Sequence, residues 1–337
     1  MLITLVASGL LLAAGGVPAA EAVATSVPPA LAPVDIKEWT VPWADSRPRD
    51  PYPDGQGGIW FVGQTGHYVA RLDPKSGEFK RIALEPGTGP HNLIVDPKGT
   101  VWFSGNLKGY IGRLDPATEK ITKYPMPDPE ARDPHTLVFG KDGVMWFTVQ
   151  FGAFVGRFDP KSGDVRLVKM PAKSTRPYGI VIDSKGRPFF NEFGTSKIGT
   201  LDPATLALKE YALPDPGARS RRIGMTRDDK VWYVDYARGY LGRLDPRTGE
   251  VKEWPAPSGD QSLPYAMAVD DRDRLWIVET GPQPNRFLGF DPKEEKFFAG
   301  APVPGGGGTV RHMVFVPATR EIWFGTDKNT IGRARVP

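Results

Sequence analysis

The stretch PHNLIVDPKGTVWFSGNLKGYIGRLDP, residues 90–116, decides the fold, because approximate copies of it recur to the end of the chain. Each copy carries an aromatic residue in its second hydrophobic run. These residues are Trp60, Trp102, Trp146, Phe189, Trp232, Trp276 and Trp323. Seven copies are therefore present, with spacings of 42 to 47 residues. Such a period is typical of four-stranded propeller blades rather than of helical repeats.

One copy, taken in detail, predicts four strands. Residues 92–96 form a short apolar run, DPKG at 96–99 is turn chemistry, and residues 100–104 form a second run. Two further runs cover residues 109–114 and 120–124, and prolines follow the last of them. No segment between the copies has a sustained helical period. We therefore expect an all-β domain.

A short segment near the N-terminus predicts how the ring closes. Residues 36–42, IKEWTVP, match the fourth strand of a later copy, VKEWPAP at 251–257, yet they precede the first copy. The last copy ends at Pro337, after its third strand. We therefore expect a seven-bladed β-propeller over residues 36–337, in which the N-terminal strand completes blade seven. Closure leaves only short, protected sheet edges.

The first residues resemble an export signal. Residues 2–20 carry no charge and are rich in Leu, Ala and Gly, and small residues follow at 20–24. We expect a signal peptide at 1–24, a flexible lead-in at 25–35, and a periplasmic or secreted protein. An uncleaved membrane anchor is the alternative, although the run is short for a span of about 30 Å. No other membrane contact is expected.

Composition excludes several classes of function. The chain has no cysteine, so it has no disulfide, thiol nucleophile or covalent c-type haem site. Its formal charge is +4 over 337 residues, without a basic run that would track nucleic acid. We expect no nucleic-acid partner, no haem and no nucleotide cofactor, and a monomer.

Counting along each predicted hairpin suggests where a site lies. The residue that opens the innermost strand should lie at one mouth of the central tunnel, directly across from the residue fourteen positions later. The opening positions are Arg49, His91, His135, Tyr178, Arg221, Tyr265 and His312. Their expected partners are Gly63, Gly105, Val149, Glu192, Asp235, Glu279 and Thr326. Further positive charge lies one or two residues away, at Arg47, Arg176, Arg219, Arg222 and Arg311.

These two rings have more than one interpretation. Imidazoles on one side and carboxylates on the other indicate a site, and Glu192, Asp235 and Glu279 together offer three oxygen donors for Ca²⁺ or a related ion. A solvated tunnel mouth also accepts polar residues without any function, and Arg221 with Asp235 is equally explained as a cross-strand ion pair. The repeated Trp and Leu-Asp-Pro residues are interpreted as structural.

The repeat resembles that of the streptogramin lyases, in its Pro-His/Tyr-x-x-x-x-Asp-x-x-Gly-x-x-Trp-Phe run followed by Ile-Gly-Arg-Leu-Asp-Pro. The resemblance implies a propeller and an elimination that opens a cyclic depsipeptide with Mg²⁺ and a histidine base. His91 and His135 match the two histidines of the lyase pattern. Asp133 stands in place of its first glutamate and Val149 in place of its second, so the pattern is incomplete.

Three functional hypotheses follow. The favoured one is a metal-assisted C–O lyase acting on an ester or lactone other than a streptogramin, with His135 as base, His91 assisting, and Asp133 binding Mg²⁺. A lactonase-like hydrolase would place Mg²⁺ or Ca²⁺ on Glu192, Asp235 and Glu279. The alternative is non-catalytic binding of an anionic small molecule, glycan or peptide at the tunnel mouth, or a scaffold for a protein. Residues expected to contact the ligand are Arg49, Tyr178, Arg221, Tyr265 and His312.

Overall fold

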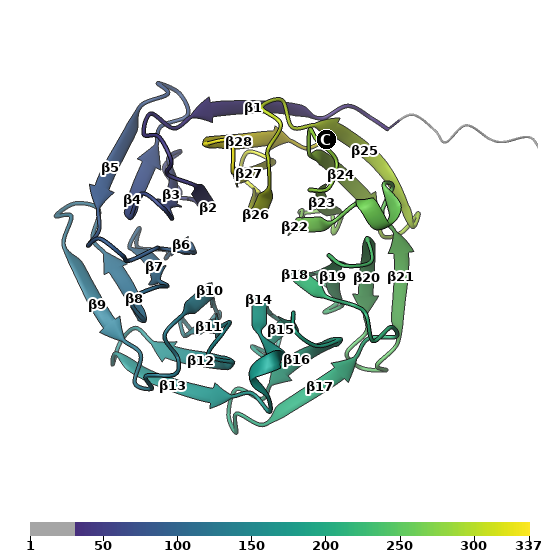
Figure 1. Ribbon diagram of the computed structural model, residues 1–337, viewed down its shortest axis with the longest axis horizontal. Coiled ribbons are helices and arrows are strands. Elements are labelled where there is room, and N and C mark those ends of the chain that lie inside the picture. The colour runs from purple at the N-terminus through teal and green to yellow at the C-terminus, as the bar shows by residue number, and fades with distance from the viewer. Residues whose placement is uncertain (1–30) are drawn as a thin grey trace, which may run out of the picture. The chain divides into compact units, whose positions relative to one another are not determined.

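The computed structural model describes residues 31–337, which form seven four-stranded antiparallel sheets arranged as a ring (Figure 1). The prediction of an all-β, seven-bladed propeller is confirmed. The innermost strands, which surround the central axis, are β2 (Pro48–Pro53), β6 (Leu93–Val95), β10 (Pro134–Phe139), β14 (Pro177–Ile182), β18 (Ser220–Met225), β22 (Pro264–Val269) and β26 (Val310–Val316).

The other strands follow outward in the same order in every blade. Second strands are β3 (Ile59–Gly63), β7 (Val101–Gly105), β11 (Met145–Val149), β15 (Pro188–Glu192), β19 (Val231–Asp235), β23 (Leu275–Glu279) and β27 (Glu321–Thr326). Third strands are β4 (Tyr68–Leu72), β8 (Tyr110–Leu114), β12 (Phe154–Asp159), β16 (Lys197–Leu201), β20 (Tyr240–Leu244), β24 (Arg286–Asp291) and β28 (Thr330–Arg335). Outermost strands are β5 (Phe79–Ala83), β9 (Ile121–Pro125), β13 (Asp164–Lys169), β17 (Leu208–Ala212), β21 (Val251–Pro255), β25 (Lys296–Pro302) and β1 (Asp35–Thr40).

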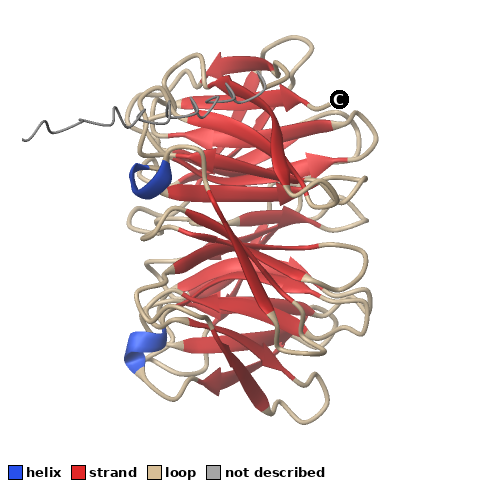
Figure 2. Ribbon diagram, turned by 90° about the vertical axis from the view of Figure 1, so that its right-hand side faces the viewer, coloured by secondary structure: helices blue, strands red, loops and turns tan. Residues whose placement is uncertain are grey.

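Helix is confined to short connections in the described part of the chain. The two 3₁₀ turns η1 (Lys173–Thr175) and η2 (Gly259–Gln261) each link an outermost strand to the next innermost strand. Figure 2 shows both on the same face of the ring, with the strands running between the two faces. No helix within residues 31–337 is long and apolar enough to cross a membrane.

The repeated Asp-Pro-x-Gly and Trp residues act together in building each hairpin. In blade two, Asp96 Oδ1 accepts hydrogen bonds from the N–H groups of Lys98 at 2.9 Å and Thr100 at 3.0 Å. Gly99 takes a positive φ of 82°, which glycine adopts without strain. The other carboxylate oxygen of Asp96 accepts from Trp102 Nε1 at 3.0 Å. The repeated residues are thus structural, as expected.

The N-terminal strand closes the ring as predicted. Strand β1 pairs antiparallel with β28, from Asp35 opposite Arg335 to Thr40 opposite Thr330. The Trp39 ring stacks on that of Trp323 at 5.3 Å between centroids. Blade seven therefore combines residues from both ends of the propeller, and the pairing covers an edge of β28 that would otherwise be open.

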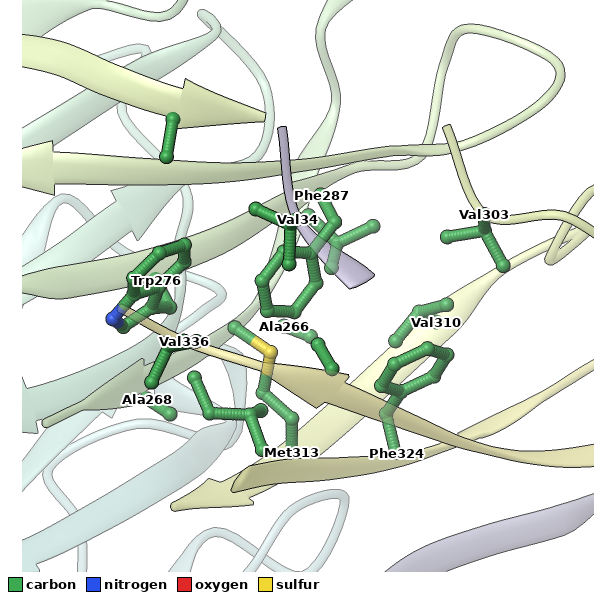
Figure 3. Close-up of a cluster of buried hydrophobic side chains, with 14 residues drawn as sticks. Val34, Ala266, Ala268, Trp276, Phe287, Val303, Val310, Met313, Phe324 and Val336 are labelled. Atoms are coloured by element: carbon green, nitrogen blue, oxygen red, sulfur yellow. The ribbon is translucent and has the colours of Figure 1, made fainter. Parts of the chain in front are cut away.

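The ordered contacts of the chain with the propeller begin a few residues before the position that the sequence indicated. The N–H of Ala32 donates to the Phe298 carbonyl at 2.9 Å, and strand β1 begins at Asp35. Val34 is buried in the cluster that contains Trp276 and Phe287 (Figure 3). Residues 32–35 therefore pack on the propeller, although the sequence placed them in a flexible lead-in. The expected signal peptide, 1–24, lies outside the described residues.

Candidate functional site

A β-bulge near the start of the innermost strands changes the expected pairing. Glu192 pairs with Pro177, Asp235 with Ser220, and Glu279 with Pro264. Each carboxylate thus lies across from the residue before the expected one, so the fourteen-residue count was wrong by one position. A bulge inserts an extra residue into one strand and re-aims the side chains on either side of it.

The opening positions themselves converge in the tunnel. We name as the polar belt the residues Arg49, Asp50, His91, His135, Tyr178, Arg221, Arg222, Tyr265 and His312. The ring centroids of His91 and His135 lie 3.7 Å apart, and those of His135 and Tyr178 lie 4.2 Å apart. The Tyr178 and Tyr265 hydroxyl groups are hydrogen-bonded to each other. Side chains from several blades therefore meet as one cluster.

Arg222 connects four blades within this cluster. Its Nε donates to the Arg311 carbonyl at 2.9 Å, and its Nη1 donates to Thr136 Oγ1 at 3.2 Å. Its Nη2 lies 3.7 Å from Asp50 Oδ2, and both side chains are almost fully buried. The sequence indicated Arg222 beside the opening positions but did not indicate Asp50. Only the bulge allows two successive residues, such as Arg49 and Asp50, to contribute to the tunnel.

The polar belt has an excess of positive charge. Asp50 lies 3.6 Å from Arg49 Nε and accepts from Asn92 Nδ2 at 2.8 Å. Burial alone would raise the pKa of Asp50, but His312, Arg49 and Arg222 outweigh burial and hold that pKa below its usual value. The Asp50 carboxylate is therefore the shared ion-pair partner of Arg49 and Arg222.

Arg221 has a different environment. Within residues 31–337, no carboxylate forms an ion pair with it, and its buried Nε has no hydrogen-bond partner. Its guanidinium carbon lies 3.9 Å from the ring centroid of Tyr265, 4.4 Å from that of Tyr236 and 4.8 Å from that of Phe193. Aromatic faces stabilise a guanidinium but leave its N–H groups free to donate.

The histidines of the belt are neutral at physiological pH. Burial, followed by Arg49, lowers the pKa of His91 well below 6.5, and burial with Arg222 does the same to the pKa of His135. Native proteins leave few buried polar groups without a hydrogen-bond partner. In the polar belt such atoms gather: Arg49 Nε and Nη2, Asp50 Oδ1, His91 Nδ1, His135 Nε2, Arg221 Nε, Arg222 Nη2 and His312 Nδ1.

The two hydrogen-bonded phenols are shifted in opposite directions, which gives a pH prediction. Burial raises the pKa of Tyr178, but Arg221, Arg222 and Arg49 outweigh it and lower the pKa to about 8. Burial raises the pKa of Tyr265 to about 12. An ultraviolet titration should therefore detect one phenolate forming near pH 8. Tyr178→Phe should remove this transition, while Tyr124→Phe, on the outermost strand β9, should keep it.

The free energy of unfolding should also depend on the ionisation of Tyr178. An unperturbed tyrosine has a pKa near 10.0, so between about pH 8 and 10 the folded protein has released a proton that the unfolded chain retains. The free energy of unfolding should gain a contribution from Tyr178 as the pH rises through this window. An identical pH profile for the Tyr178→Phe variant would contradict the assignment.

The three carboxylates of the expected partner ring are occupied elsewhere. Glu192 accepts from Thr195 Oγ1 at 2.7 Å, and burial raises the pKa of Glu192 to about 7. Asp235 accepts from Arg238 Nε at 2.6 Å and from the N–H of Arg219 at 2.9 Å. The explanation of Arg221 and Asp235 as a cross-strand ion pair was therefore wrong.

Glu279 completes this pattern of local contacts. It accepts hydrogen bonds from the N–H and Oγ of Ser258 at 2.8 and 2.7 Å, and it lies 3.2 Å from Arg286 Nη1. Glu192, Asp235 and Glu279 each stabilise a connection near their own blade. The structure does not bring them together as a shared set of metal ligands.

The remaining metal ligand suggested by the sequence is also engaged. Asp133 accepts from the N–H of Phe151 at 2.6 Å and from that of Gly152 at 2.9 Å, so it orders the loop after β11. Val149 offers no ligand atom. Within residues 31–337, no group of three or more His, Asp or Glu side chains is placed to hold a metal ion. The residues present therefore do not fit the Mg²⁺ that the lyase resemblance implies.

Comparisons with known proteins agree with the fold. The chain is similar to a streptogramin B lyase of known structure, with 24% identity, a TM-score of 0.81, and coverage of 90% of this chain and 98% of the other. It is similar to a catalytically inactive histidine-to-alanine variant of virginiamycin B lyase from Staphylococcus aureus with quinupristin. There the identity is 22%, the TM-score 0.81, and the coverage 90% and 100%. At these identities the likeness establishes the fold alone.

Sequence comparisons reach further in one respect. Curated protein sequences give no significant match. The model of the virginiamycin B lyase family, however, matches residues 23–283, which is most of the chain. The chain therefore belongs to the virginiamycin B lyase family.

Proposed function

We propose that this protein binds an anionic small molecule in the central tunnel, with Arg221 as its principal contact. The observation that carries the proposal is the environment of Arg221: a half-buried guanidinium with no ion-pair partner among the described residues, lying among aromatic rings. A buried charge without a partner is costly, and a bound carboxylate or phosphate would offset that cost with charge-assisted hydrogen bonds.

The rest of the polar belt supports an anion rather than a cation. Arg49 and Arg222 share Asp50 as their carboxylate partner, and Arg221 forms an ion pair with no carboxylate among residues 31–337. The histidines add donors without charge, because their pKa values lie far below 7. A metal cation would meet three guanidinium groups, one carboxylate and three neutral imidazoles, and the electrostatic field there disfavours it.

A second candidate keeps the elimination chemistry but not the metal. The opposite pKa shifts of Tyr178 and Tyr265 are the pattern of an acid–base pair. The Tyr178 phenolate would remove a proton from the carbon next to a carbonyl, and Arg221 would stabilise the developing enolate. A C=C bond would then form as the C–O bond between the β-carbon and the ester or lactone oxygen breaks, and Tyr265 would protonate the carboxylate that leaves. This candidate also requires the anion contact at Arg221.

The proposal is tested by calorimetric titration with succinate and with inorganic phosphate. Arg221→Gln should weaken binding at least about tenfold, because a hydrogen bond to a charged group contributes roughly 1.5–3 kcal/mol. The matched control is Arg243→Gln in the same blade, since Arg243 also lies over aromatic rings, those of Trp232 and Trp254. It should leave the affinity unchanged.

Two outcomes would count against the proposal. One is the absence of binding by either anion at millimolar concentration. The other is equal affinity of the Arg221→Gln and Arg243→Gln variants. For the second candidate, Tyr178→Phe should retain anion binding and abolish any ester or lactone elimination, and persistent turnover would exclude the phenolate as base.

A further inference from the structure

The tunnel holds a chamber that adjoins the polar belt. A cavity of about 500 Å³ is lined by residues from all seven innermost strands. We name as the apolar mouth Tyr52, Ile94, Val138, Val181, Met225, Val269 and Val314, one from each of these strands. They lie toward the ends of the strands, whereas the polar belt lies toward their starts. Pockets of this size and apolar character are typical of small-molecule sites.

Most of the apolar mouth is open to solvent in part. Val138, Val181, Met225, Val269 and Val314 are half-buried, because each packs in part against a hydrophobic core cluster and also lines the cavity. A row of partly exposed apolar side chains around a concave surface is unfavourable in water and becomes favourable when an apolar ligand covers it. The apolar mouth therefore favours binding of a hydrocarbon chain.

The base of the chamber carries a few polar groups. Asn92 is engaged at both ends, because its Nδ2 donates to Asp50 and its Oδ1 accepts from the Leu137 N–H at 2.8 Å. Thr136 Oγ1 already accepts from Arg222. His312 is different: it lines the cavity, it is half-buried, and its Nδ1 has no partner. Burial lowers the pKa of His312 to about 4 despite nearby Asp50, so its imidazole is neutral.

The charged groups nearest the base and rim are paired, apart from the exposed Lys141. Behind the base, Arg222 and Asp50 face each other, so an anionic ligand end would approach Asp50 and a cationic one would approach Arg222. At the rim, Lys141 is exposed and Asp183 pairs with Arg187 at 2.7 Å. The residues that line the base therefore offer a charged ligand end no unpaired counter-charge, whereas a neutral group that donates and accepts a hydrogen bond suits a neutral imidazole.

We propose that the apolar mouth binds a linear aliphatic molecule with an uncharged polar end, such as an alcohol or a primary amide, whose end contacts His312. This site is separate from the anion site at Arg221 and does not depend on it. It gives the propeller two ligand sites of different chemistry, one on each side of the layer formed by Arg222 and Asp50.

The test is calorimetric titration with butanol, hexanol and octanol. Affinity should rise about fourfold with each added methylene, because burial of a CH₂ group contributes about 0.8 kcal/mol. Octanoate and octylammonium should bind at least about tenfold more weakly than octanol, because a charged end loses hydration at the base. Arg221→Gln should leave octanol binding unchanged, which separates this site from the proposed anion site.

Variants locate the site. Met225→Glu places a carboxylate in the half-buried wall and should reduce octanol binding at least tenfold, and Val181→Trp should do the same by filling the chamber. The control is Leu107→Glu, at a residue that is 67% exposed and does not line the chamber. Affinity independent of chain length, octanoate binding as tight as octanol, or full binding by both wall variants would overturn the proposal.

Discussion

Deletion of residues 1–40 should lower the melting temperature by more than about 10 °C, because it removes the strand that closes the ring. Strand β1 supplies six residues of antiparallel pairing with β28 and the stack of Trp39 on Trp323. Without it, β28 becomes an open edge, and open edges pair with other chains. The deleted protein should therefore also aggregate, which size-exclusion chromatography would detect.

The matched control is a deletion that ends at residue 30, which leaves every described strand in place. Trp39→Ala provides a milder test, since it keeps the backbone pairing and removes the stack on Trp323. We expect the melting temperature of Trp39→Ala to lie between that of the control and that of the 1–40 deletion. If the 1–40 deletion melts with the control and stays monomeric, β1 is not required for closure.

Arg222→Ala should cost roughly 3–5 kcal/mol of unfolding free energy, the second large effect that we expect. The substitution leaves the Asp50 carboxylate buried with Arg49 as its remaining cation, at 3.6 Å. It also removes the donors to Thr136 Oγ1 and the Arg311 carbonyl. Urea denaturation measures the difference, and Arg243→Ala, outside the tunnel, should cost much less.

The pH dependence of this effect has a defined sign. The pKa of Asp50 is lower in the folded protein than the ordinary aspartate value of 3.8, so its carboxylate stabilises the fold above that value and loses this contribution as the pH falls further. Adding Asp50→Asn to Arg222→Ala should restore part of the stability, because a carboxylate left with Arg49 alone, at 3.6 Å, is no longer buried. No recovery in the double variant would show that the cost of Arg222→Ala comes from packing alone.

The sequence predicted the blades well because every blade uses the same local chemistry. Asp96, Gly99 and Trp102 contact one another within a single hairpin, so their pattern in the chain carries the structure directly. Ring closure could also be predicted, because residues 36–42 match an outermost strand but precede the first copy of the repeat. Short-range turn chemistry and a repeated period together determine where the strands of each blade begin and end.

The site was predicted less completely, and the reason is the β-bulge. No residue type marks a bulge in these strands, yet it moves Glu192 and Glu279 one position from where the count placed them. The same irregularity brings Asp50 into the tunnel beside Arg49. Contacts across the ring, such as that of Arg222 with Thr136, join residues far apart in sequence, and no local pattern records them.

We propose that the polar belt holds an anion through Arg221 without a divalent metal. Titration of succinate into the wild-type protein, first with EDTA and then with Mg²⁺, tests it most directly. The account predicts the same affinity in both conditions and its loss in Arg221→Gln. Binding that appears only with Mg²⁺, or that survives Arg221→Gln unchanged, would contradict it.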